Sequence, residues 1–363
     1  MPATPLLKGL RGLLGQIPLE SIQPNSDSPV TPEDLTTLTS YNLLPKRKRT
    51  IIVPGCPSVW APAAGPKKVK PDAGKYLMDP IRHAFPKCPL EPLLRALATT
   101  QPDFNMEEID LVTDRRNLRL LLAFVGGKKS AFRIDIEVVH STVLFSCWTP
   151  NNTRFVKGFG GYGCEFEKAS TRKPNGLRES VTHNRAIRYN FGGIKAVVRF
   201  EVDACTGPIR DIPRTMSLSN KYQTPTGYTV LTRGYIVEPS RIVEIKTGPV
   251  GKNLEVSKNI AQLWFSQTPI LCEGHYDRIG IFSEVTKKDL MQEGKLTRWE
   301  EDNREKLRKL VQVIQMVAGM VRAAPQNKYA LVLPAGANTL KVYEVANQCD
   351  KGVPKDLLAM WRV

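Results

Sequence analysis

The stretches that decide the fold are VRFEVDA at residues 198–204 and VEIKT at residues 243–247. The first run carries Glu201 and Asp203, and the second carries Glu244 and Lys246. Alternate residues of a β-strand point to the same side, so each charged pair is expected to converge on one face. Charges inside largely apolar runs are costly unless a metal ion or a partner satisfies them. Two such strands therefore predict a functional site.

These residue types are typical of a core that hydrolyses phosphodiesters with divalent metals. Carboxylate oxygens are hard ligands, which suit Mg²⁺ or Mn²⁺. A cation bound there would neutralise the scissile phosphate and lower the pKa of a bound water, and Lys246 would orient or help to deprotonate that water.

Hydrophobic periodicity around the two stretches predicts an α/β (α+β) fold with a mixed central β-sheet flanked by helices. Helices are expected around 166–169, over 254–267 and over 284–324. The predicted strands lie at 131–138, 143–148, 194–203, 228–237, 241–247, 328–333 and 339–345.

The N-terminal region differs in composition from the rest. Residues 1–40 are rich in Pro, Ser and Thr with little periodicity, which predicts a flexible leader before a single domain over 41–363. The run PKRKR at 45–49 is either a nuclear import signal or a solvated basic lead-in to a strand. We therefore expect the protein in the nucleus, with the cytoplasm as the alternative.

Charge and cysteine content limit the class of protein. Lys and Arg number 52 against 35 Asp and Glu, so the net charge is +17, which favours a polyanionic partner such as nucleic acid. No apolar run reaches the roughly 18 residues of a spanning helix, so we expect no membrane insertion. The seven cysteines include no C-x-x-C pair, which argues against structural zinc and for a reducing compartment.

The ordered motifs resemble the DXO-type RNA decapping nucleases, in particular fungal members, whose core is a variant of the PD-(D/E)XK nuclease fold. The family carries G-Y-K-F-E, E-V-D and E-(L/I)-K motifs and then a helix with a Gln. This chain has GCEFE at 163–167, EVD at 201–203, EIK at 244–246 and QLWFSQTP at 262–269, followed by Gly274, Asp277 and Gly280. The resemblance covers roughly residues 40–350.

The resemblance implies the metal ligands and the catalytic centre. One or two divalent cations, Mg or Mn, would be held by Glu167, Glu201, Asp203 and Glu244. Lys246 would position the nucleophilic water, which makes Asp203, Glu244 and Lys246 the catalytic core.

The resemblance also implies the contacts to substrate. Gln262 would contact the scissile phosphate or the first nucleotides, together with Lys246. Arg115, in the stretch DRRNL at 114–118, best fits the family's N-terminal Arg that meets the RNA backbone, and Arg116 is the alternative register.

The first motif departs from the family pattern. Cys164 and Glu165 stand where the family usually has Tyr and Lys, so a negative charge replaces a positive one beside the metals. If the segment is helical, Glu165 and Glu167 diverge by about 200°, and only one of them can be a ligand. We take Glu167 as the ligand from its motif register.

The function implied is a metal-dependent hydrolase of RNA 5′ ends that removes incomplete or non-canonical caps, including NAD-type caps, with 5′–3′ exoribonuclease activity as a further step. Its partners would be single-stranded RNA 5′ ends and a 5′–3′ exoribonuclease. Two alternatives stay open at this point. One is a non-catalytic RNA-binding protein that stabilises an exoribonuclease, and the other is a DNA-directed PD-(D/E)XK nuclease.

Overall fold

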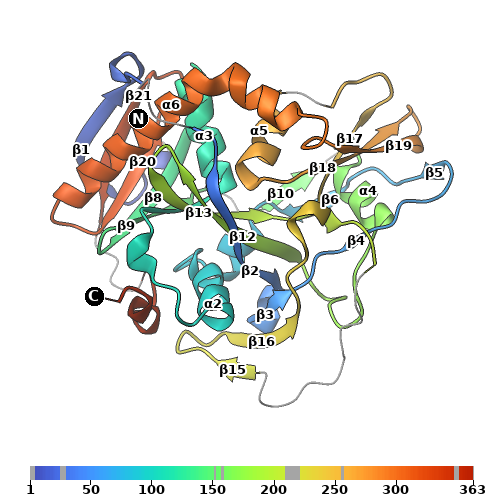
Figure 1. The fold of residues 1–363 in the computed structure, drawn as a ribbon, viewed down its shortest axis with the longest axis horizontal. Coiled ribbons are helices and arrows are strands. Elements are labelled where there is room, and N and C mark those ends of the chain that lie inside the picture. Colours follow the sequence, from blue (N-terminus) through green and yellow to red (C-terminus); the bar gives the residue numbers. More distant parts are fainter. Residues whose placement is uncertain are drawn as a thin grey trace.

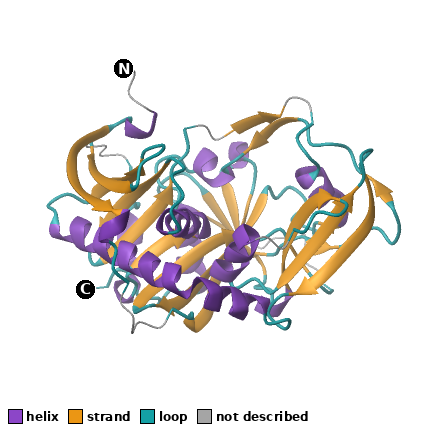
Figure 2. Cartoon of the chain, turned by 90° about the horizontal axis from the view of Figure 1, so that it is seen from above, coloured by secondary structure: helices purple, strands orange, loops and turns teal. Residues whose placement is uncertain are grey.

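The protein is described from a computed structural model, which covers residues 5–24, 30–150, 153–156, 159–208, 221–254, 257–346 and 351–362. Two β-sheets dominate the described residues, and they lie side by side in Figure 2. No helix in these ranges is long and apolar enough to cross a membrane.

The larger sheet is mixed and contains twelve described strands. β13 runs parallel to β7 and antiparallel to β12, which places the EVD-bearing strand in the middle of the sheet. In spatial order the strands are β1 (Leu10–Pro18), β21 (Thr339–Val345), β20 (Lys328–Leu333), β8 (Phe132–Val139), β9 (Thr142–Cys147), β7 (Leu111–Asp114), β13 (Ile194–Glu201), β12 (Thr182–Phe191), β2 (Glu33–Leu43), β3 (Thr50–Gly55), β16 (Thr229–Gly234) and β15 (Lys221–Gln223).

The smaller sheet contains seven described strands and carries the EIK motif on its central strand. In spatial order they are β11 (Thr171–Arg172), β4 (Val59–Trp60), β14 (Ala204–Cys205), β17 (Ile242–Pro249), β18 (Ile270–Tyr276), β19 (Ile281–Asp289) and β5 (Lys67–Lys68). A separate antiparallel pair consists of β10 (Thr153–Val156) and β6 (Gly74–Leu77).

Three helices pack on one another beside the larger sheet: α3 (Arg115–Val125), α5 (Ser257–Ser266) and the long α6 (Lys295–Ala323) (Figure 1). Trp264 is buried where α5 meets α6, and its indole Nε1 donates a hydrogen bond of 2.9 Å to Glu300. The other helices are α1 (Pro80–Ala84), α2 (Glu91–Thr100) and α4 (Gly163–Ser170), with short 3-10 turns at Pro5–Leu7, Leu19–Ser21, Lys46–Lys48, Met106–Glu108, Pro239–Arg241 and Lys355–Met360.

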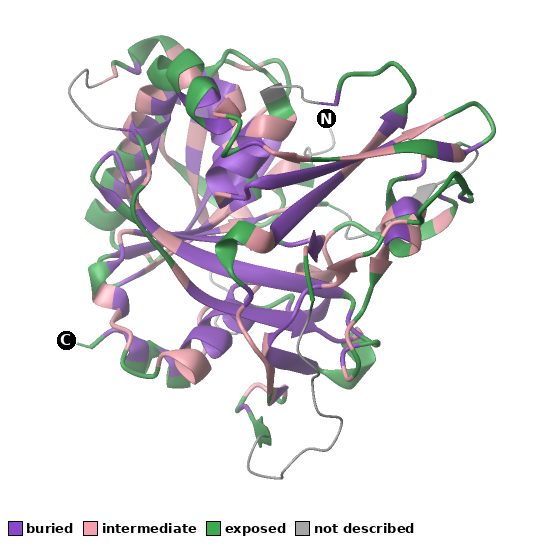
Figure 3. Ribbon diagram, turned by 45° about the vertical axis from the view of Figure 1, so that its right-hand side comes forward, coloured by how far each residue is buried: buried purple, intermediate pink, exposed green. Residues whose placement is uncertain are grey.

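The burial pattern separates the sheets from the outer surfaces. Figure 3 shows that the strands of the larger sheet are mostly buried, whereas the outer turns of α6 are exposed. This pattern confirms the predicted class, a mixed central sheet flanked by helices.

The predicted flexible leader over residues 1–40 is wrong for its described parts. Leu10–Pro18 forms β1, which pairs with β21 near the other end of the chain, and Glu33–Leu43 forms β2, which pairs with β12. The threonine-rich run at 36–39 was a local strand signal. The composition rule failed because strand pairing decides the structure here, and besides the nearby β3 the partners β21 and β12 lie more than a hundred residues away.

The helix predicted over 284–324 begins later than expected. Ile281–Asp289 pairs with β18 as a strand, and Gly294 adopts a left-handed conformation with φ of 66° immediately before α6. Glycine tolerates this conformation, which lets the chain turn sharply between the strand and the helix. The strand predicted at 228–237 also ends early, at Gly234, whose Cβ would lie 2.2 Å from the Gly55 carbonyl oxygen.

The chain crosses from the larger sheet to the smaller sheet within the EVD motif. Glu201 ends β13, and Ala204 begins β14, which pairs antiparallel with β17. This crossing places Glu201 and Asp203 at the seam between the sheets, next to the strand that carries Glu244 and Lys246.

Candidate active site

Glu244 is the centre of a buried hydrogen-bond network that joins three elements. Its Oε2 lies 3.1 Å from Nη1 of Arg115 on α3. Its Oε1 accepts from Lys246 Nζ on the same strand and from Gln262 Nε2 on α5. The glutamate is only 3 % exposed, so these charge-assisted contacts replace the water that it loses on burial.

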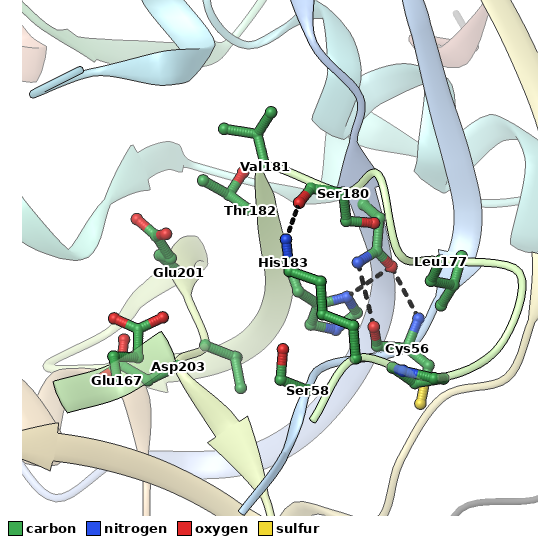
Figure 4. A pocket seen from close by; sticks show the side chains of 14 residues that line it. Cys56, Ser58, Glu167, Leu177, Ser180, Val181, Thr182, His183, Glu201 and Asp203 are labelled. Carbon is green, nitrogen blue, oxygen red and sulfur yellow. Dashed lines mark hydrogen bonds between the residues drawn. The ribbon is translucent and has the colours of Figure 1, made fainter. Parts of the chain in front are cut away.

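Asp203 is fixed against the strand that carries Glu244. Its Oδ2 accepts a hydrogen bond of 2.7 Å from the backbone N–H of Ile245. In Figure 4, the side chains of Glu167, Glu201 and Asp203 lie on the same side of a small pocket of about 40 Å³. The predicted convergence of Glu201 and Asp203 is therefore present, although the chain leaves the strand between them.

Helix α4 presents Glu167, and not Glu165, to the other carboxylates. Glu165 points away and forms an ion pair of 2.6 Å with exposed Lys168. Asp72 accepts hydrogen bonds of 3.2 and 3.0 Å from the backbone N–H groups of Cys164 and Glu165 at the helix start. This contact fixes the rotation of α4, since it satisfies N–H groups that have no partner within the helix.

Gly274 and Gly280, which follow the QLWFSQTP motif, support α4 and do not line the site. A Cβ on Gly274 would lie 2.4 Å from Cζ of Phe166, and one on Gly280 would lie 2.6 Å from the hydroxyl of Tyr162. Asp277 accepts hydrogen bonds from the backbone N–H groups of the turn between β18 and β19. These residues let the aromatic side of α4 pack closely on the smaller sheet.

The clustered carboxylates perturb one another's ionisation. Burial, and then the neighbouring charges of Glu201 and Glu244, raise the pKa of Glu167 to about 7. The surrounding protein atoms and the charge of Asp203 raise the pKa of Glu201 to about 8, although the residue is exposed where it lines a neighbouring cleft. Burial, and then the charges of Glu244 and Glu167, raise the pKa of Asp203. Burial would raise the pKa of Glu244 too, but Lys246 and Arg115 lower it.

This donor set suits a hard divalent cation. Neighbouring carboxylates that oppose each other's ionisation would be relieved by a bound positive charge. Within the described ranges, no three His, Cys, Asp or Glu side chains form a ready metal-binding group. Both Glu244 oxygens contact basic or amide side chains, so a cation at Glu244 requires those contacts to loosen.

Arg115 is the arginine that faces the carboxylates, and Arg116 is exposed in the adjoining cleft. Sequence reasoning gave no role to Arg119, whose Nη1 donates a hydrogen bond of 2.9 Å to Oε1 of Gln262. The signal that could have found it is its spacing of four from Arg115, which puts both on one helix face. Gln262 is thereby held between Arg119 and Glu244.

Two clefts with several basic side chains adjoin the carboxylate site. A cleft of about 210 Å³ is lined by Glu201 and by four arginines, Arg115, Arg116, Arg119 and Arg199, together with Asp79 and with Asp114, which pairs with Arg199. A second cleft, of about 510 Å³, is lined by Lys246 with Lys128, Lys252 and Lys258. Basic side chains therefore lie near Glu201 in one cleft and near Lys246 in the other.

This fold is that of the Rai1 and Dxo1 proteins, which confirms the resemblance at the level of the fold. Rai1 of Scheffersomyces stipitis in complex with (3′-NADP)⁺ and a calcium ion has a TM-score of 0.61 and 13% identity, covering 97% of this chain and 98% of that chain. Candida albicans Rai1 in complex with pU5 and Mn²⁺ has a TM-score of 0.59 and 12% identity, covering 96% and 98%. K. lactis Dxo1 in complex with manganese has a TM-score of 0.53 and 11% identity, covering 92% and 98%.

By sequence, the chain belongs to the family described as Domain of unknown function (DUF8563), whose model matches residues 17–361. No curated protein matches it.

Proposed function

We propose that this protein is a divalent-metal-dependent hydrolase that acts on RNA 5′ ends and removes incomplete or non-canonical caps, including NAD-type caps. The observation that carries the proposal is the convergence of four carboxylates and one lysine at the seam between the two sheets, next to two clefts with basic side chains. These residues are Glu167, Glu201, Asp203, Glu244 and Lys246. Degradation of the remaining RNA from its 5′ end would use the same groups.

Each side chain has a role that follows from its position. A cation bound by the carboxylates would stabilise charge on the scissile phosphate and acidify a water. Lys246 would orient that water, and Glu244 holds the lysine in place. Arg115 and Gln262 would exchange their contacts with Glu244 for contacts with a phosphate oxygen, which is a charged acceptor like the carboxylate that they leave.

The relatives of the same fold support this choice of substrate and metal. Candida albicans Rai1 holds pU5 with Mn²⁺, and Scheffersomyces stipitis Rai1 holds (3′-NADP)⁺ with calcium. The net charge of +17 also suits a chain of phosphates. Binding of single-stranded RNA should therefore weaken as salt rises.

The experiment offers the purified full chain a panel of matched 5′ ends with Mn²⁺ or Mg²⁺. The panel contains RNAs with monophosphate, triphosphate, unmethylated cap and NAD ends, and a DNA of the same sequence. Glu244→Gln runs in parallel, because the change keeps the shape of the side chain while it removes its charge. The released products are identified by mass.

The proposal expects an intact cap or NAD-type fragment to be released, with dependence on metal and on Glu244. RNA that binds but is not cut with either metal would favour a non-catalytic partner of an exoribonuclease. One observation favours that non-catalytic alternative: Glu244 is already in contact with Arg115, Lys246 and Gln262. Preferential cutting of the DNA would favour the DNA-directed alternative.

A further inference from the structure

A second cavity, of about 390 Å³, lies against the larger sheet and outside the carboxylate site. Its floor comes from β8 and β20 through Ile136 and Tyr329, and one wall is the segment 86–90 after α1. The volume falls within the usual range for small-molecule sites, roughly 300–1,000 Å³.

The cavity is strongly basic. Two carboxylates also line it, and both are already satisfied: Asp135 pairs with Arg82 and Arg133 at 3.3 and 2.6 Å, and Glu137 accepts from the backbone N–H of Val353. The cations that line it are Lys8, Arg82, Lys87, Arg133, Lys328 and Lys351.

Three of these cations are available to a ligand. Lys8, Lys87 and Lys351 are exposed, and none forms an ion pair with a described residue. The backbone N–H of Gly352 donates a hydrogen bond of 3.1 Å to the carbonyl of Lys87, which brings the Lys87 and Lys351 segments together. Positive charge is thus gathered in the lining of the cavity, and these three lysines have no ion-pair partner among the described residues.

An aromatic side chain lines the same cavity as these lysines. Trp148 follows β9 and lines the cavity, and the guanidinium carbon of Arg133 lies 5.2 Å from its ring centroid. Arg82 Nη1 donates a hydrogen bond of 2.7 Å to the carbonyl of Cys147 and so anchors the preceding residue. A fixed indole next to uncompensated cations suits a ligand that combines a flat ring with phosphate.

The cavity is separated from the carboxylate site by a shared wall. Cys147 lines the arginine-rich cleft, whereas the next residue, Trp148, lines this cavity. Residues of helix α1 also line both spaces: Pro80 and Ile81 line the cleft, and Arg82 lines the cavity. A ligand here would occupy a place distinct from a 5′ end held at Glu201.

We propose that this cavity binds a nucleotide, with its base stacked on Trp148 and its phosphates held by Lys87, Lys351 and Lys8. The nucleotide is either free or one unit of an RNA chain, and both present the same ring and phosphate. The inference goes beyond the proposed hydrolysis and does not depend on it.

The test is calorimetric titration of the full chain with ADP in EDTA, so that metal-dependent chemistry plays no part. The affinity for ADP should fall at least tenfold in the double variant Lys87→Glu/Lys351→Glu. It should not fall in the control Lys195→Glu, which reverses the charge of an exposed lysine on β13. Trp148→Ala should weaken binding, and Trp148→Phe should restore it.

Adenosine and inorganic pyrophosphate should each bind at least tenfold more weakly than ADP. If pyrophosphate binds as tightly as ADP, the base does not stack on Trp148. If the double variant and the Lys195→Glu control weaken binding equally, ADP does not bind in this cavity. A five-nucleotide RNA distinguishes a free nucleotide from a unit of an RNA chain. If this RNA binds more tightly than ADP and its binding depends on Lys87 and Lys351, the cavity binds RNA. If it binds as tightly as ADP or more weakly, the cavity binds a free nucleotide.

Discussion

Arg115 Nη1 lies 3.1 Å from Glu244 Oε2. This buried ion pair joins helix α3, which packs on the larger sheet, to strand β17 of the smaller sheet. The same nitrogen also lies 3.1 Å from Oγ of Ser266 on α5. The three elements that carry the candidate site are therefore tied together through one guanidinium, so the site and the packing of the two sheets depend on each other.

Arg115→Gln should destabilise the protein strongly. Removing one partner of a buried pair costs about 3–5 kcal/mol when the remaining charge is uncompensated. Lys246 still pairs with Glu244 in this variant, so the loss should lie near the lower end, about 3 kcal/mol. Exposed Arg116 is the matched control, and Arg116→Gln should change the free energy of unfolding by no more than about 0.5 kcal/mol. Urea unfolding at pH 7 measures both. Equal stability of the two variants would show that the pair between the sheets contributes nothing.

Mn²⁺ should raise the unfolding temperature of the protein. A ligand at about 100 times its Kd adds about 2.7 kcal/mol to the stability of the folded state. The carboxylate cluster is the site that would bind it, so Asp203→Asn should remove the shift. Thermal unfolding with EDTA, Mn²⁺ and Ca²⁺ gives the answer without an activity assay, and a full shift in Asp203→Asn would place the cation elsewhere.

Stability should fall on the acid side because of His183. Burial, and then the charge of Arg185, lower the pKa of His183 from 6.5 to about 3. Between these two pH values the unfolded chain binds a proton at His183 and the folded chain does not. The folded state therefore has its full stability above pH 6.5 and loses free energy of unfolding as the pH falls towards 3. The slope is about 1.4 kcal/mol per pH unit.

His183→Asn is the variant to compare, since His183 Nδ1 lies 3.0 Å from Oδ1 of Asn42 and the amide can take this position. Urea unfolding at pH 7 and pH 5 should show a smaller loss in the variant than in the parent. An identical loss would assign the acid sensitivity to other groups.

Gly274→Ala should displace helix α4. The added Cβ would lie 2.4 Å from Cζ of Phe166, whose ring is buried and stacked on Phe282 at 4.2 Å. Overpacking of this kind costs typically about 1–3 kcal/mol. Gly319→Ala in α6 meets nothing within 4 Å and should be neutral or stabilising. Phe166→Leu should partly rescue Gly274→Ala, and without any rescue the proposed clash is not the cause.

The sequence predicted the parts of the site that depend on local order. The EVD and EIK spacings placed Glu201 with Asp203 and Glu244 with Lys246. The 200° divergence on a helix left room for only one of Glu165 and Glu167, and the motif register selected Glu167. The structure agrees in each case, since Glu165 pairs with exposed Lys168. The two strand pairs needed only the repeat of a strand, whereas the choice of Glu167 also needed the resemblance to the family motif.

The parts that were missed depend on contacts between distant segments. The pairing of β1 with β21 joins the two ends of the chain, and Asp72 caps a helix about ninety residues later. The bond from Arg119 to Gln262 likewise spans 143 residues. No periodicity encodes such pairs, because tertiary packing alone brings them together.

The central claim is that the carboxylates facing the seam support hydrolysis, and the two glutamates of α4 test it most directly. Glu167→Gln and Glu165→Gln make the same chemical change on one helix, but only Glu167 lies with Glu201 and Asp203. Release of 5′ fragments from RNA with Mn²⁺ should fall at least a hundredfold in Glu167→Gln and stay within about twofold of the parent in Glu165→Gln. Equal activity of the two variants, or loss only in Glu165→Gln, would contradict the account.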